Sequence, residues 1–259
     1  MPELPDLQVF SHNLHKELKG KTLQKIAVLN GKHLHVTATE LNKNLAGTVL
    51  KKVYREGKQL RFTFENDQVL GMHLMLHGKL FWFDKKNTEK YTIVELLFDN
   101  GLGLALTDYQ SIATISLNPE EKSAPDAISD QMTSVYLKNT FSKSKKKIKD
   151  ILLDQNIIQG IGNAYADEIL WEARLSPFSI ANKIPENKVT ELNKAIKKIL
   201  TEAEKKILKS NPDIIAGEVR DFLLIHHTKN ETSPTGASIK QKDISSRKTY
   251  YTDEQELYN

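Results

Sequence analysis

Apolar residues at helical spacing mark the start of the chain and most of its second half. Leu7, Phe10, Leu14 and Leu18 follow one another at steps of three or four residues, which is typical of an amphipathic helix. Similar spacing recurs beyond residue 140. The predicted helices are 6–18, 144–153, 164–174 and 186–208, with a weaker one over 216–224.

Between the first helix and the middle of the chain, short segments rich in branched and aromatic residues alternate with Gly, Asn or Asp. The predicted strands are 22–29, 49–54, 59–64, 68–74, 79–83, 91–98, 102–106 and 112–117. Strands this closely spaced favour an antiparallel sandwich or barrel, so the fold class is expected to be α+β. Two further β-prone pieces, 223–226 and 248–251, flank a turn and predict a terminal hairpin.

These changes of pattern predict how the chain is divided. At 259 residues it is longer than a usual domain, which favours two. We expect a β-sandwich domain over 1–118 that includes the first helix. A Pro-, Ser- and charge-rich linker with a short helix follows over 119–139. A helical domain over 140–222 and a hairpin over 223–259 complete the chain.

Composition narrows the class of protein. Hydrophobic residues make up 39% and charged residues 27%, which is an ordinary globular balance. The longest apolar runs fall far short of the roughly 18 residues that a membrane span needs. The N-terminus, with Glu3 and Asp6, lacks the positive charge and apolar run of a secretory signal. We therefore expect a cytoplasmic protein, nucleoid-associated in a prokaryote, with no membrane partner and no sign of an oligomer, hence a monomer.

The chain contains no cysteine, which excludes disulfides, thiolate nucleophiles and Cys-type zinc sites. The close histidine pairs, such as His226 and His227, have no obvious third ligand nearby, so neither a metal nor a cofactor is expected. A formal charge of +4 is only weak support for a polyanionic partner.

Pro2 is the most informative single residue. Initiator methionine is usually removed before a small residue, so the mature chain can begin with a secondary amine. A free α-amino group titrates at roughly 7.7 to 8.0 and is therefore partly unprotonated and nucleophilic at neutral pH. Glu3 follows it near a helix N-terminus, where its carboxylate could shuttle protons. Alternatively, Pro2 is merely a rigid start to the helix.

Two other segments can carry chemistry or bind anions. Lys58, in a Gly57-Lys58 turn between predicted strands, could supply a cation beside the amine or simply be solvated. A lysine-rich run over 143–149, ending at Lys149, precedes a Gly-Ile-Gly turn at 160–162. Two glycines before a helix let backbone N–H groups converge on a phosphate, with Gly162 and Asn163, the expected N-cap, at the helix start. A simple tight turn between helices is the alternative.

Taken in this order, these segments resemble the formamidopyrimidine-DNA glycosylase and endonuclease VIII family of base-excision repair enzymes. The resemblance covers nearly the whole chain. It rests on the opening Met1-Pro2-Glu3-Leu4-Pro5-Asp6, on Gly57-Lys58, on the stretch from His73 to Lys79, and above all on 153–168, which looks like the family's helix-two-turn-helix. The resemblance implies a bifunctional DNA glycosylase and AP lyase that acts on oxidised bases in double-stranded damaged DNA and then nicks the strand by β/δ-elimination.

The resemblance also implies roles for individual residues. Pro2 would be the Schiff-base nucleophile, Glu3 the acid/base group and Lys58 the lysine near a phosphate and the sugar. The residues that would contact DNA are His73, Leu76 as the wedge, Lys149, Gly162, Asn163 and Arg247, the last at the tip of the terminal hairpin.

The chain departs from the family pattern in three places. Members usually end in a four-cysteine zinc finger, whereas Ser233, Thr252 and Gln255 stand near those ligand positions here, so a zincless finger held by packing is expected. One branch of the family has an arginine and a phenylalanine that fill the gap left by the flipped base. Here the corresponding stretch begins Asp108-Tyr109-Gln110, with Tyr109 or Gln110 as possible substitutes. The stretch that ends at His226 also lacks a long glycine-rich loop, which resembles the endonuclease VIII branch.

Two other hypotheses stand beside the enzyme. One is a damaged-DNA or abasic-site binding protein of the same fold without catalysis. The other is a helix-two-turn-helix protein that works with RNA or the ribosome, in which the strand-rich residues 20–117 would have no role.

Overall fold

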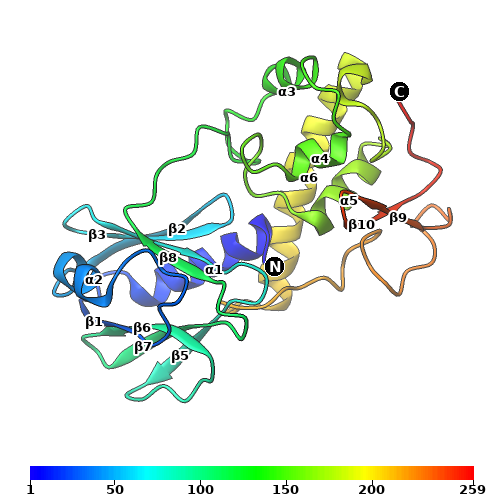
Figure 1. Cartoon of the computed structure of the whole chain (residues 1–259). Coiled ribbons are helices and arrows are strands. Elements are labelled where there is room, and N and C mark those ends of the chain that lie inside the picture. Colours follow the sequence, from blue (N-terminus) through cyan, green and yellow to red (C-terminus); the bar gives the residue numbers. More distant parts are fainter. The chain divides into compact units, whose positions relative to one another are not determined.

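Eight strands in the first half of the chain pair into two antiparallel sheets, which form two layers in the computed structural model of residues 1–259 (Figure 1). One sheet has the order β1-β6-β7-β5 and the other β2-β3-β4-β8. The strands are β1 (Leu23–Val28), β2 (Leu50–Glu56), β3 (Gln59–Phe64), β4 (Val69–His73), β5 (Lys79–Asp84), β6 (Thr92–Phe98), β7 (Leu102–Thr107) and β8 (Thr114–Leu117). All eight predicted strands are present, and the predicted α+β class with an N-terminal sandwich is confirmed.

The first helix, α1 (Leu4–Leu18), carries the predicted apolar stripe, and Phe10, Leu14 and Leu18 are fully buried. Glu3 and Asp6 cap its start, and the helix packs against β2. A second helix, α2 (Ala38–Leu45), was not predicted from the sequence. It buries only Leu41 and Leu45, too few apolar positions to reveal a helical period, and its start is set by the Thr37 side chain, which accepts the Glu40 N–H at 3.1 Å.

The chain forms two structural units, each with its own core. The first contains Met1–Glu121 together with Ile207–Glu218, and the second contains Lys122–Lys206 together with Val219–Asn259. The first boundary lies close to the one expected after residue 118. The sequence did not predict that 207–218 belongs to the first unit. This segment packs with residues about two hundred positions earlier; for example, the Asn13 side chain donates to the Ile214 carbonyl at 2.8 Å. Composition read along the chain does not reveal contacts at such a separation.

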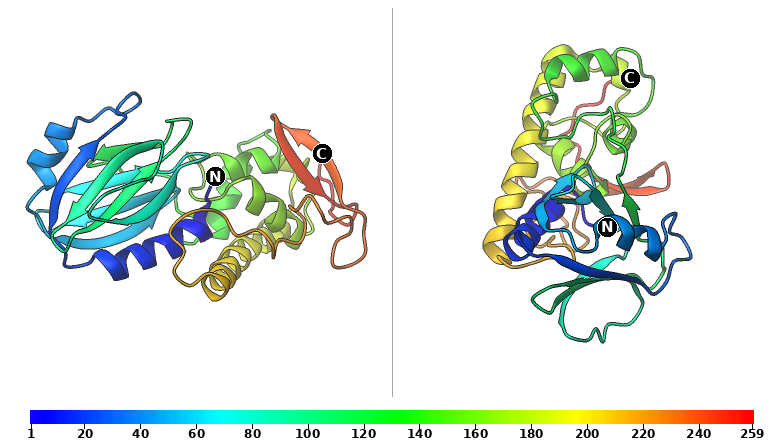
Figure 2. Two further views of the ribbon diagram at one scale, coloured as in Figure 1. Left: turned by 90° about the horizontal axis from the view of Figure 1, so that it is seen from below. Right: turned by 90° about the vertical axis from the view of Figure 1, so that its left-hand side faces the viewer.

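The second unit is built of helices and one hairpin (Figure 2). Its helices are α3 (Ser134–Phe141), α4 (Ile148–Leu153), α5 (Asn163–Glu172) and α6 (Glu186–Ser210), with a 3-10 turn at Ala181–Lys183, and the last turn of α6 falls in the first unit. The strands β9 (Lys240–Ile244) and β10 (Arg247–Tyr251) form the terminal hairpin. No helix has the length and apolar character that a bilayer crossing requires.

Two elements expected between 216 and 226 are absent. The weak helix over 216–224 is replaced by turns, and Gly217 adopts a φ of 91°, which is incompatible with a right-handed helix. The strand over 223–226 does not form either. Its backbone N–H groups at Leu224, Ile225 and His226 donate instead to the carboxylate of Glu168, at 2.7 to 3.0 Å, so no strand partner is needed.

Candidate functional site

Pro2 and Glu3 are buried at the start of α1, in the first structural unit. Glu3 is the N-cap residue and forms a capping box with Asp6, in which the Glu3 N–H donates to Asp6 Oδ2 at 2.9 Å. The partial positive charge of the helix terminus favours both carboxylates. The Glu3 side chain accepts the Asp6 N–H in return, so the carboxylate of the residue that follows Pro2 is held at the N-terminus of α1.

Met1 precedes this nitrogen, and its own α-amino group forms an ion pair with the Glu218 carboxylate within the same unit. With Met1 in place, the nitrogen of Pro2 is an amide and has no lone pair available for attack. Amine chemistry at residue 2 therefore requires the removal of Met1.

The Gly57-Lys58 turn connects β2 to β3 and is tied to α1. Gly57 has a φ of 55°, a conformation that favours glycine, and Lys58 is half-buried. Arg55 donates from one guanidinium nitrogen to the Gly57 carbonyl at 2.9 Å and from Nε to Gln8 Oε1 at 3.0 Å. Because Gln8 lies on the second turn of α1, Arg55 holds the Lys58 turn against the helix that begins with Glu3.

A sharp turn after β4 presents Leu76, whose side chain is 51% exposed. His73 ends the strand, and its Nδ1 accepts the Met75 N–H at 3.1 Å. Gly78 closes the turn by donating to the Leu74 carbonyl at 2.8 Å, and a Cβ at residue 78 would lie 2.2 Å from that oxygen. Only glycine fits there, so the turn that lifts Leu76 into solvent depends on it.

A second exposed tip lies in the loop between β7 and β8. The buried carboxylate of Asp108 accepts backbone N–H groups from Gln110, Ile112 and Ala113 at 2.9 to 3.0 Å and so fixes the loop. Tyr109 is 58% exposed, and its ring centroid lies 4.6 Å from that of His77. The Leu76 turn and the Tyr109 loop are thus in contact through this aromatic pair.

In the second unit, the turn with two glycines precedes α5 as expected. Gln155 holds it, because its amide accepts the Gly160 N–H and donates to the Ile161 carbonyl, both at 2.9 Å. The expectation that Asn163 is the N-cap is wrong: Gly162 is the N-cap and Asn163 is the first helical residue. Its side chain faces the hairpin and donates to the Lys248 carbonyl at 2.9 Å.

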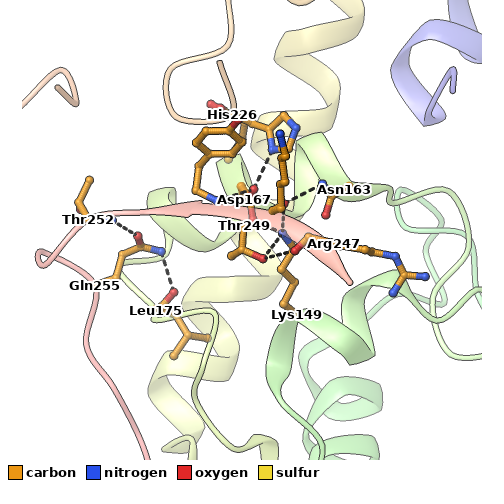
Figure 3. A network of polar contacts seen from close by, with 12 residues as sticks. Lys149, Asn163, Asp167, Leu175, His226, Arg247, Thr249, Thr252 and Gln255 are labelled. Atoms are coloured by element: carbon orange, nitrogen blue, oxygen red, sulfur yellow. Dashed lines mark hydrogen bonds and ion pairs between the residues drawn. The ribbon is translucent and has the colours of Figure 1, made fainter. Parts of the chain in front are cut away.

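Lys149 does not have the expected place on a DNA-facing surface (Figure 3). Its side chain is fully buried, and its ammonium forms an ion pair with Asp167 at 2.6 Å and a hydrogen bond to Thr249 Oγ1 at 2.9 Å. Asp167 also accepts the Tyr250 N–H at 3.0 Å and contacts His226 Nδ1 at 2.7 Å. A buried ammonium needs such partners, and this one joins α4, α5 and β10 instead of a ligand.

The exposed part of the lysine run and the hairpin tip line one cavity of about 500 Å³. Ser245 and Ser246 have positive φ angles of 48° and 62° and make the two-residue turn that ends at exposed Arg247. Figure 3 shows the Arg247 side chain extending away from the buried network. The cavity is lined by Lys146, Asp150, Leu153, Asp154, Gln155, Ser245 and Arg247. Arginine and lysine side chains suit an oxyanion such as a phosphate, but Asp150 and Asp154 also line this cavity, and Asp154 pairs with Lys146.

Sequence reasoning missed two carboxylates that organise the second unit, Asp167 and Glu168. Asp167 partners Lys149, and Glu168 holds the segment that leads toward the hairpin. Burial raises the pKa of Glu168, against the effect of the backbone N–H groups of His226, Leu224 and Ile225. The only signal in the sequence was that two adjacent acidic residues stand in the middle of an otherwise apolar helix.

The site residues are thus divided between the two units. The first unit holds Pro2, Glu3, Lys58, His73 and Leu76, and the second holds Lys149, Gly162, Asn163 and Arg247.

Comparison with known proteins matches both halves of the chain to one enzyme family. Residues 1–115 match the family model of the formamidopyrimidine-DNA glycosylase N-terminal domain, and residues 123–211 match that of the H2TH domain of the same enzymes. A formamidopyrimidine-DNA glycosylase of Carboxydothermus hydrogenoformans shares 37% identity over 203 residues, which cover 77% of this chain and 76% of the relative.

Solved structures of the Lactococcus lactis protein named Fpg are similar over nearly the whole chain. One is a complex with DNA that contains an abasic site and another a complex with DNA that contains an oxidized pyrimidine. Each has 25% sequence identity and a TM-score of 0.86, and each comparison covers 97% of this chain and 98% of the other.

Proposed function

Since the chain belongs to the formamidopyrimidine-DNA glycosylase family and is a DNA glycosylase of base excision repair, we propose that Pro2 is its nucleophile. After Met1 is removed, the Pro2 nitrogen attacks C1′ of the damaged nucleotide, and the base leaves with its bonding electrons and a proton. The nitrogen then loses its proton, its lone pair forms the C1′=N bond as the C1′–O4′ bond breaks, and O4′ takes up a proton, which gives the ring-opened iminium. This iminium acidifies the C2′ proton, and loss of that proton expels the 3′ phosphate. A second elimination then expels the 5′ phosphate.

The observation that carries this proposal is the pairing of residue 2 with a fixed carboxylate. Glu3 directly follows Pro2, is buried and is held by the capping box at the positive end of α1, and in the proposed role its carboxylate takes a proton from the amine and returns it to the sugar oxygen or the departing base. The Lys58 turn, tied to α1 through Arg55 and Gln8, would bring a cation to the damaged nucleotide while negative charge develops on the departing base.

DNA is the partner of this family, and we propose that this chain binds damaged double-stranded DNA at two groups of residues. Gly162, Asn163 and Arg247 bind the phosphate backbone; Gly162 and Asn163 stand at the N-terminus of α5, and Arg247 lines the cavity at the hairpin tip. His73 binds phosphate near the exposed Leu76, which fills the gap left by the flipped base together with Tyr109. The complex of the Lactococcus lactis relative with an oxidized pyrimidine supports an oxidised base as the lesion.

Borohydride trapping on a duplex with one abasic site tests the proposal. The intact protein is expected to give a covalent adduct whose linkage maps to residue 2, because borohydride reduces the iminium to a stable amine. Mass determination of the same protein should show that Met1 is absent. Tight binding of the abasic duplex with no adduct, from protein that begins at Pro2, would mean that the chain only binds damage.

Replacing Lys58 by alanine is expected to impair base excision more than cleavage of a preformed abasic site. Excision needs the cation while negative charge develops on the departing base, whereas the abasic sugar reacts without that step. Parallel single-turnover assays on a lesion duplex and an abasic duplex measure the two rates. Equal losses in both would remove Lys58 from this role.

Removing the charges of Lys146 and Lys147 together should weaken binding to all duplexes alike. Both side chains are exposed, and Lys146 has only a partly exposed partner in Asp154 at 3.5 Å. Each lost phosphate contact should lower the slope of log K against log salt by about 0.9. Lys205, exposed on α6, offers a matched control whose replacement should leave the slope unchanged. An unchanged slope in the double variant would mean that these lysines face only solvent.

We also propose that the chain acts as a monomer on nucleoid DNA in the cytoplasm. The exposed large apolar side chains lie in both units: Leu29 stands in the first, Val135 and Leu257 stand in the second, and Leu76 and Tyr109 of the first belong to the proposed DNA-binding residues. Sedimentation at several protein concentrations, with and without a duplex, tests the oligomeric state.

A further inference from the structure

The terminal hairpin has little apolar packing of its own. Four of the five residues of β9 are exposed, and a hairpin of two strands is at best marginally stable in water. Its apolar contacts come from a small cluster in which Tyr250 and Ile239 meet Trp171 and Ile225, with an edge contact between Tyr251 and Phe178 besides. Hairpins as exposed as this one require further ties to hold one orientation.

No metal provides such a tie from the residues of this chain. The chain has no cysteine, and nowhere do three His, Asp or Glu side chains come together in a way that could hold an ion. The hydroxyl and amide side chains at Ser233, Thr252 and Gln255 are poor zinc ligands and are engaged in hydrogen bonds.

The Glu254 carboxylate is the point at which three separate segments meet. From the loop before β9, Ser233 Oγ and Thr235 Oγ1 donate to it at 3.1 and 2.5 Å. From the segment after β10, Thr252 Oγ1 donates at 3.1 Å. A third group of contacts comes from the end of α5.

Trp171, on α5, donates its indole N–H to Glu254 at 3.3 Å. Arg174, just beyond the C-cap of α5, forms an ion pair with the same carboxylate at 3.2 Å, and its guanidinium lies over the Trp171 ring at 4.4 Å. One half-buried carboxylate thus receives three hydroxyls, one indole and one guanidinium. Hydrogen bonds to an ionised acceptor are stronger than those between neutral groups.

The charge on Glu254 is maintained by these donors. The hydrogen bond from the Thr235 hydroxyl, with those from the Trp171 indole N–H and the Ser233 and Thr252 hydroxyls, lowers the pKa of Glu254 to about 2, against the effect of partial burial. Because this pKa lies below the value of 4.5 for the unfolded chain, the Glu254 contacts stabilise the folded hairpin above pH 4.5. That stabilisation is lost as the pH falls from 4.5 toward 2.

Glu254 and Arg247 lie at opposite ends of the same strand. β10 begins at Arg247 and ends at Tyr251, three residues before Glu254, while Thr249 in the middle is fixed by Lys149. If β10 is held both at Glu254 and at Thr249, its orientation is fixed, and so is the position of the Arg247 side chain at the hairpin tip. We propose that Glu254 is a positioning residue, the anion that ties the base of the hairpin to α5 and thereby sets where Arg247 meets the DNA backbone. The part that concerns DNA rests on the proposed role of Arg247.

The first test is hydrogen exchange of the free, full-length protein, which needs no DNA. In Glu254→Gln the amides of 240–251 should exchange faster, while those of α1 and the sheets of the first unit should be unchanged. Asp253→Asn is the matched control, because this neighbouring carboxylate makes only an exposed ion pair with Lys240. Thr235→Val, which removes one donor without touching the carboxylate, should give a smaller increase in the same amides.

The second test is a double-variant cycle on duplex binding with Glu254→Gln and Arg247→Ala. Each single variant should weaken binding by about tenfold and lower the salt slope by about 0.9, and the double variant should be no worse than Arg247→Ala alone. Chelator treatment of the wild type should change neither value.

Additive losses, or a normal salt slope in Glu254→Gln, would overturn the positioning role, as would equal exchange in Glu254→Gln and Asp253→Asn. Neither test needs catalysis. A failure of borohydride trapping would therefore not affect the proposed role of Glu254, and a failure of these two tests would not affect the proposed role of Pro2.

Discussion

A Pro2→Gly variant is expected to lose the borohydride-trapped adduct by at least about a thousandfold while binding an abasic duplex nearly as well as the wild type. Proline is the only residue whose nitrogen becomes a secondary amine, and it reaches a cationic iminium directly on losing water. Glycine supplies a primary amine without the ring that fixes its direction beside Glu3. The loss should therefore appear in the chemical step and leave binding unchanged.

Pro5→Ala is the matched control for this experiment. Pro5 is also buried and stands in the first turn of α1, but its nitrogen is an amide in every form of the chain. Its replacement should preserve the adduct. A Pro2→Gly protein that is trapped at the wild-type rate would transfer the nucleophilic role to another amine, and peptide mapping of the adduct would identify it.

An Asp167→Asn variant is expected to lose about 3–5 kcal/mol of unfolding free energy in the second unit. The substitution leaves the Lys149 ammonium in a fully buried place with no opposite charge, where its desolvation is no longer offset. It also weakens the acceptor of the Tyr250 N–H and of His226, so the hairpin should loosen with the helices. Denaturant unfolding of a Trp82→Phe background, in which Trp171 is the remaining tryptophan, measures the change by fluorescence.

Glu172→Gln on the same helix is the control for Asp167→Asn. Glu172 pairs with Lys198 at the same N···O distance of 2.6 Å, but the lysine is 53% exposed and the pair is solvated. Its loss should lower the free energy of unfolding by no more than about 1 kcal/mol. Similar effects of the two substitutions would mean that the burial of Lys149 carries no penalty, contrary to the argument above.

The strands could be predicted because each carries its own signal. β3 alternates apolar with polar residues and β6 is rich in branched residues, and both lie between turn residues, so neither pattern needs knowledge of the partner strand. The helix α2 lacked such a signal, since two buried leucines in eight residues show no period. The segment over 216–226 gave a wrong signal, because its apolar residues suggested regular elements. The backbone N–H groups at 224–226 are bound instead by Glu168, 56 to 58 residues earlier in the chain.

The candidate site likewise contains residues whose place was predicted from local motifs and residues whose place depends on distant partners. The Pro2-Glu3 start and the Gly57-Lys58 turn are local motifs, and the structure keeps both at element boundaries, as expected. Lys149 was grouped with its lysine neighbours because charge in a sequence suggests a solvated face. Its actual environment is set by Asp167 and Thr249, eighteen and one hundred residues away, and no local pattern reveals partners at that separation.

The Glu254 cluster has a consequence for the conditions under which this protein works. Oxidised bases arise where reactive oxygen species are abundant, and the same species convert zinc-bound thiolates to disulfides or sulfenic acids and release the metal. A hairpin anchored by carboxylate, hydroxyl and guanidinium groups has no sulfur to lose in this way. The anchor of this hairpin is therefore resistant to the reactive oxygen species that oxidise DNA bases.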